Sequence, residues 1–166
     1  MDIIQKLQEL QEVDIIQKLQ ELQEKENRRR ATAVSYLEKL EEELAPMFEN
    51  IVGENTNPEY MNVLWVAVFD KAQGKYTPKH SSLYFRYTTW RGEKQSEPPG
   101  FYIDYTRYGV WGNPLTEVRG KDFWQYLKQV TDWLVDYLPG WIEQNDKSRD
   151  QRFERFVNIV RAIAEK

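Results

Sequence analysis

The sequence predicts an α+β protein with a long N-terminal helical arm, a three-stranded antiparallel meander and two C-terminal helices packed on one sheet face. Three observations predict this class. Apolar residues recur at helical spacing up to residue 50, the pattern becomes strand-like between residues 62 and 111, and helical spacing returns from residue 120. The chain of 166 residues is long enough for one domain. We therefore expect a helical arm at residues 1–31 and a compact α+β domain at residues 32–166.

The arm contains an identical tandem repeat, DIIQKLQELQE, at residues 2–12 and 14–24. A step of twelve residues advances a helix by three turns and about 120°, so the two copies place their apolar residues on different sides. The second copy is in phase with the helix that follows, and we interpret the first copy as the addition. The apolar residues are candidates for helix association with a second chain or for folding back on the domain. They are Ile3, Ile4, Leu7 and Leu10 in the first copy, and Ile15, Leu19 and Leu22 in the second.

Charged residues interrupt the apolar pattern between residues 23 and 31, which predicts a solvated connection that can be helical or not. The helix at residues 32–50 then regains an apolar face and ends near Gly53. We expect this face to pack on the domain. It consists of Ala33, Val34, Leu37, Leu40, Leu44 and Phe48.

Three runs predict the strands of the meander. Residues 62–70 are apolar without a break, as in a strand buried on both faces, whereas residues 82–91 and 100–111 alternate. We expect the layer against the helices to contain Trp65, Phe69, Phe85, Phe101 and Ile103. The opposite face would then carry Tyr84, Arg86, Trp90, Tyr102, Asp104 and Tyr108.

Helical spacing after Gly120 predicts the first C-terminal helix, which we expect Pro139 and Gly140 to end. Ser148 and Gln151 have the spacing of a capping box, which predicts the start of the last helix. Both helices have an apolar face that we expect to be buried. These faces consist of Phe123, Tyr126, Leu127, Val130, Leu134 and Leu138 in the first helix, and Phe153, Phe156, Val157, Val160 and Ile163 in the last.

The composition excludes several kinds of site. The chain has no cysteine, which excludes disulfides, thiolate metal sites and cysteine nucleophiles, and its single histidine, His80, excludes sites with two imidazoles. We find no metal-ligand spacing and no phosphate-binding glycine motif, so we expect no metal and no cofactor. The net charge of −4 arises in residues 1–50, with 12 acidic and 7 basic residues, whereas residues 51–166 have 15 and 16. This balance argues against a nucleic-acid partner.

Tyr, Trp and Arg side chains, as on the expected open sheet face, contribute most to protein interfaces. We therefore expect a non-enzymatic protein-binding domain of adaptor, chaperone or immunity-protein type. It would bind another protein through this face, through the N-terminal helix or through both, and the helix would also support self-association. The chain begins without a signal peptide and has no apolar run of about 18 residues, so we expect a cytoplasmic protein.

Three alternatives to this function stay open. The sheet face could stack the bases of single-stranded nucleic acid. The chain could be a hydrolase that uses His80. Finally, another element could cover the sheet face, such as residues 112–119 or the arm.

Overall fold

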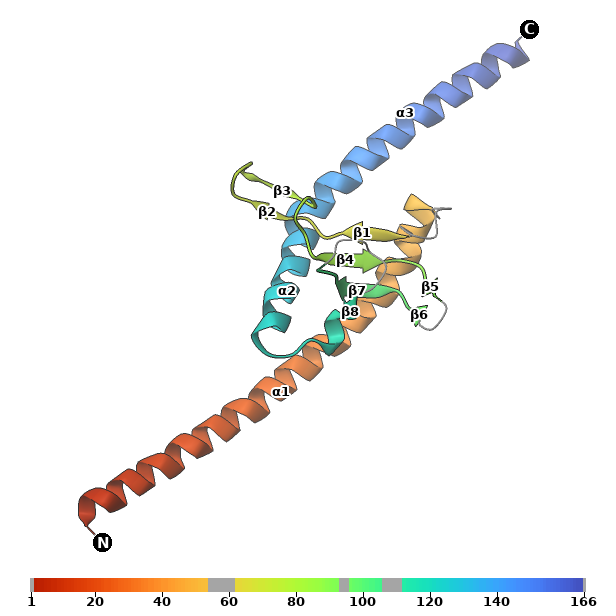
Figure 1. The fold of residues 1–166 in the computed structure, drawn as a ribbon. Coiled ribbons are helices and arrows are strands. Elements are labelled where there is room, and N and C mark those ends of the chain that lie inside the picture. The colour runs from red at the N-terminus through yellow and green to blue at the C-terminus, as the bar shows by residue number, and fades with distance from the viewer. Residues whose placement is uncertain (1, 54–61, 93–95, 106–111, 166) are drawn as a thin grey trace.

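The computed structural model of the chain describes residues 2–53, 62–92, 96–105 and 112–165. It confirms the α+β class, with a long N-terminal helix, antiparallel strands and C-terminal helices on the sheet (Figure 1). The elements in chain order are α1 (Ile3–Val52), β1 (Val63–Trp65), β2 (Val68–Asp70), β3 (Lys75–Thr77), β4 (Leu83–Arg86), β5 (Trp90–Arg91), β6 (Ser96–Glu97), β7 (Gly100–Ile103), β8 (Asn113–Pro114), the 3-10 helix η1 (Leu115–Glu117), α2 (Gly120–Asp132), the π-helical turn η2 (Trp133–Tyr137) and α3 (Leu138–Ala164).

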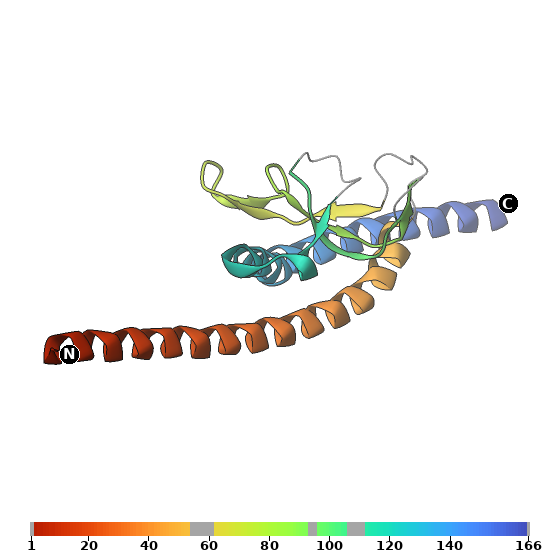
Figure 2. The same ribbon diagram turned by 60° about the horizontal axis from the view of Figure 1, so that its bottom comes forward.

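Helix α1 runs for 50 residues and includes residues 23–31, the connection for which a helical conformation was left open. It ends as expected, because Gly53 adopts a positive φ of 79° and its N–H donates to the Glu49 carbonyl at 2.9 Å. Pro46 lies inside the helix, and Figure 2 shows that α1 curves where it approaches the domain. The arm and the first helix of the domain are therefore one continuous element.

The main sheet has four antiparallel strands in the order β1-β4-β7-β8. Its first three strands form the expected meander, with Leu64 opposite Phe85 and Phe85 opposite Phe101. The expected strand at residues 62–70 is in fact two strands, because β2 leaves the sheet and pairs with β3 in a separate hairpin. Strands β5 and β6 form a second hairpin.

Two of the aromatic residues that we expected in the helix-facing layer lie elsewhere. Phe69 belongs to the β2-β3 hairpin, where it is 52% exposed and contacts Tyr76. Trp65 lies opposite Tyr84 on the other sheet face, because side chains alternate along a strand. Leu64 takes its place in the helix-facing layer.

The core forms between one sheet face and the helices α1, α2 and η2. Phe48 of α1 is central, with ring centroids 5.6 Å from Phe85, 6.0 Å from Trp133 and 5.8 Å from Trp141. The apolar faces expected for residues 32–50 and for the first C-terminal helix are confirmed, since all their members are buried or pack on this cluster.

The C-terminal part differs from the expectation in two ways. Pro139 and Gly140 do not end a helix, because the π-helical turn η2 comes first and Pro139 falls in the first turn of α3, where no backbone N–H is needed. Ser148 and Gln151 therefore lie inside α3 and cap nothing. Among the described residues, no helix combines the length and the apolar character needed to cross a membrane.

Candidate functional site

The aromatic face of the sheet holds a compact cluster of polar aromatic and charged side chains. Tyr84 of β4 and Tyr102 of β7 lie opposite each other, and their rings stack with centroids 5.6 Å apart and an interplanar angle of 16°. The Arg86 guanidinium carbon lies 5.8 Å from the Tyr84 ring centroid. All three residues are buried, with exposed fractions of 0% for Tyr84, 4% for Tyr102 and 1% for Arg86.

Glu97 of β6 binds this cluster from the side of the β5-β6 hairpin. Its Oε1 accepts hydrogen bonds from Arg86 Nε at 2.8 Å and from the Tyr84 hydroxyl at 2.5 Å, and its Oε2 accepts one from the Gly112 N–H at 3.2 Å. The ion pair is buried, but both carboxylate oxygens have hydrogen-bond donors, which offsets the cost of removing the charges from water. Glu97 was not among the residues expected at a site, because its neighbours Lys94 to Pro99 have the composition of a loop.

The backbone of Gly112 lies directly against the side chains of Tyr84 and Tyr102. A Cβ at this position would lie 2.6 Å from the Tyr84 hydroxyl oxygen and 2.7 Å from the Tyr102 Cβ, so only glycine fits without a shift. Burial, together with the nearby Glu97 carboxylate, raises the pKa of both tyrosines above its usual range. The phenol groups therefore stay protonated and act as fixed hydrogen-bond donors inside the fold.

The expectation that this face is open to a partner is wrong for most of its residues. Tyr84, Arg86, Tyr102 and Asp104 are buried, and Trp90 is half-buried. Tyr108 lies outside the described residues. The alternative expectation, that another element covers the face, agrees with the positions of Gly112 and Glu97.

A second polar feature is a cavity of about 830 Å³ between α1 and the β6–β8 region. Five glutamates contribute to its lining: Glu97, which belongs to the buried cluster described above, half-buried Glu41, and Glu38, Glu42 and Glu117. The Glu41 Oε2 accepts a hydrogen bond from the Phe101 N–H at 3.0 Å, while its Oε1 is buried with no hydrogen-bond donor among the described residues. Burial raises the pKa of Glu41 to about 7, against the lowering effect of the Phe101 N–H. The described residues contain no group of three His, Cys, Asp or Glu side chains that could hold a metal ion.

The N-terminal arm, defined here as residues 2–25, has a row of apolar side chains that the domain leaves uncovered. All described residues of the arm are exposed, which excludes the folding of the arm back on its own domain in this structure. The side chain of Leu10 lies outside the described part. The other six association candidates are between 54% and 74% exposed: Ile3, Ile4, Leu7, Ile15, Leu19 and Leu22.

The base of the arm is fixed to the domain at two residues of α1. Glu26 accepts a hydrogen bond from Trp124 Nε1 of α2. Arg30 donates to the carbonyls of Thr116 and Val118 at 2.6 and 2.8 Å, and its guanidinium carbon lies 5.1 Å from the Phe123 ring centroid. Arg30 is thus a structural residue that holds the direction in which the arm leaves the domain.

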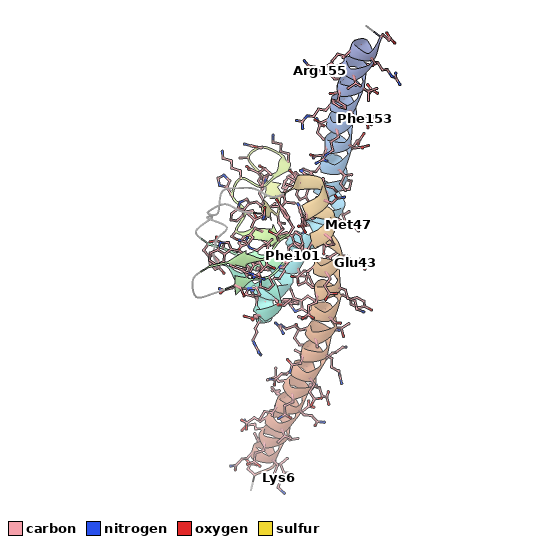
Figure 3. All side chains as sticks on the ribbon, turned by 90° about the vertical axis from the view of Figure 1, so that its right-hand side faces the viewer. Lys6, Glu43, Met47, Phe101, Phe153 and Arg155 are labelled. Atoms are coloured by element: carbon pink, nitrogen blue, oxygen red, sulfur yellow. The ribbon has the colours of Figure 1, made fainter. Side chains whose placement is uncertain are left out.

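The C-terminal part of α3 forms a second projection, which we call the tail and define as residues 147–164. Figure 3 shows Phe153 and Arg155 on this projection, beyond the sheet and far from Lys6 at the other end. The burial that we expected for the apolar face of the tail is wrong, except that Val157 is half-buried. Its exposed members, between 46% and 69%, are Phe153, Phe156, Val160 and Ile163, together with Ile159.

Neither a family model nor a curated protein nor a solved structure matches this chain. His80, the candidate of the hydrolase alternative, lies exposed in a turn between β3 and β4.

Proposed function

We propose that the chain is a non-enzymatic protein-binding protein of adaptor type that works in the cytoplasm and binds through the arm of α1. The observation that carries this proposal is the row of exposed Ile and Leu side chains along the arm. Contiguous exposed apolar surface of this kind is typical of interaction sites, and an isolated helix of about 25 residues is marginal without a partner to pack on.

The attachment of the arm supports this function. Because α1 is continuous from the arm into the core, and because Glu26 and Arg30 bind the domain, the arm projects in a fixed direction. A binding element that is already held in place loses less conformational entropy when its partner binds. Its spacing of apolar residues suits recognition by another helix.

The buried aromatic face argues against the two functions that we expected of it. Tyr84, Arg86 and Tyr102 stabilise the fold through Glu97, so they offer neither an interface nor a stacking platform for single-stranded nucleic acid. The hydrolase alternative gains no support from the exposed turn that holds His80.

Site-specific photocrosslinking tests the proposal in the organism that encodes the chain. A photoreactive phenylalanine analogue replaces either Leu19, on the apolar row, or Gln17, which lies about 160° away around the same helix. We expect protein adducts from position 19 and few from position 17, whether the captured protein is another copy or a different chain. Equal yields from both positions, or no adducts from position 19, would contradict the proposal.

A further inference from the structure

We propose that the arm of one chain binds the tail of a second copy of the same chain. This inference rests on the proposed function of the arm and names its partner. In the described part of the chain, the tail is a second helix with an exposed apolar row. The arm and the tail lie too far apart to pack on each other within one chain.

The arm and the tail leave the domain at opposite ends (Figures 1 and 2). At a rise of 1.5 Å per residue, the arm extends about 35 Å and the tail about 27 Å. Their apolar side chains therefore point into solvent at two distant ends of the molecule. In a pair of chains, the arm of each chain can pack on the tail of the other.

The apolar patterns of the two helices match in spacing. Ile15, Leu19 and Leu22 of the arm follow one another at steps of four and three residues, and Phe153, Phe156 and Val160 of the tail at steps of three and four. Such spacing forms the seam of paired helices, in which each side chain packs between those of the facing helix. The first repeat copy has the same spacing at Ile3, Leu7 and Leu10.

Charge favours pairing of unlike helices over pairing of like helices. The arm has six acidic and three basic residues, which gives −3, whereas the tail has five basic and two acidic residues, which gives +3. Two arms or two tails would bring together like net charges, while an arm and a tail neutralise each other. Complementary charge of this kind selects the partner and accelerates association at low salt.

Two variants of the full chain test this arrangement by complementation. The arm variant carries Leu19→Gln and Leu22→Gln, and the tail variant carries Phe153→Gln and Phe156→Gln. All four side chains are exposed, and Gln is compatible with a helix, so both variants keep the fold. The matched control is Val13→Gln, which removes an equally exposed apolar side chain about 120° away from the apolar rows of both repeat copies.

Light scattering at low salt measures the masses of the purified proteins. We expect wild type and Val13→Gln to associate to about 40 kDa or more, twice the 20.0 kDa of the chain, and each variant alone to stay at 20.0 kDa. A mixture of the two variants should regain a complex of about 40 kDa, because one contributes an intact tail and the other an intact arm.

Other outcomes overturn the inference in distinct ways. Association of the tail variant alone would show arm–arm pairing, and association of the arm variant alone would show tail–tail pairing. A wild-type chain that stays monomeric at all concentrations would exclude a second copy as the partner. If crosslinking at position 19 still captured a different protein, the proposed function would stand while this inference failed.

Discussion

The substitution Glu41→Gln should stabilise the protein above neutral pH and have little effect in mild acid. Glu41 has a buried oxygen that no donor in the described part of the chain reaches, and burial raises its pKa from 4.5 to about 7. The folded state therefore binds this proton more tightly than the unfolded state. The contribution of the protonated carboxyl to stability is complete below about pH 4.5 and is lost as the pH rises through about 7.

The size of this effect follows from the pKa difference. A shift of one unit corresponds to about 1.4 kcal/mol, so the rise of Glu41 from 4.5 to about 7 sets an upper limit of roughly 3 kcal/mol. Because the side chain is only partly buried, solvent screening reduces the expected gain to about 1–2 kcal/mol. Glutamine can still accept the hydrogen bond from the Phe101 N–H, so the variant keeps the local contact.

Urea unfolding at a series of pH values, followed by circular dichroism, measures this difference. We expect Glu41→Gln to exceed wild type in free energy of unfolding at about pH 8 and the two proteins to converge near pH 5. Glu42→Gln removes an exposed carboxylate from the same helical turn and controls for the loss of one charge. A stability difference that is constant over this pH range would refute the assignment of the raised pKa to burial of Glu41.

Three further predictions concern the fold. Arg86→Met leaves the Glu97 carboxylate buried without its cation and should cost about 3–5 kcal/mol in urea unfolding; a loss below about 1 kcal/mol would contradict a buried ion pair. Gly112→Ala places a methyl group 2.6 Å from the Tyr84 hydroxyl oxygen and should cost about 1–3 kcal/mol, and an unchanged unfolding midpoint would argue against the close approach. Deletion of residues 2–13 removes only exposed side chains where these are described, so the stability of the monomer should change by less than about 0.5 kcal/mol, and a larger loss would place the arm against the domain.

The elements that local patterns specify could be predicted from the sequence. The faces of α1 and α2 follow from apolar residues at helical spacing, and Leu37, Phe48 and Phe123 are buried as expected. The meander follows from three consecutive strand-like runs, of which the first is apolar without a break and the other two alternate. The continuation of the helix past Pro139 could not be predicted, because it depends on the π-helical turn that precedes the proline.

Which of the predicted faces is covered depends on tertiary structure, and two expectations about burial were wrong. The alternation that places Tyr84 and Arg86 on one face is the same whether solvent or the Glu97 hairpin lies above them. Likewise, the spacing of Phe153 and Phe156 shows that they share a helix face, but not that the domain ends before it reaches them. The face that we expected to bind is buried, and the face that we expected to be buried is exposed.

Disulfide crosslinking between introduced cysteines tests the pairing of arm and tail most directly, because the chain contains no cysteine of its own. Full-length Leu19→Cys and Phe156→Cys chains are mixed and oxidised, with Gln17→Cys in place of Leu19→Cys as the control. We expect a mixed disulfide dimer from Leu19→Cys and Phe156→Cys, and little from the control pair. Equal yields from both pairs, or preferential linkage of Leu19→Cys to itself, would contradict the binding of the arm to the tail of a second chain.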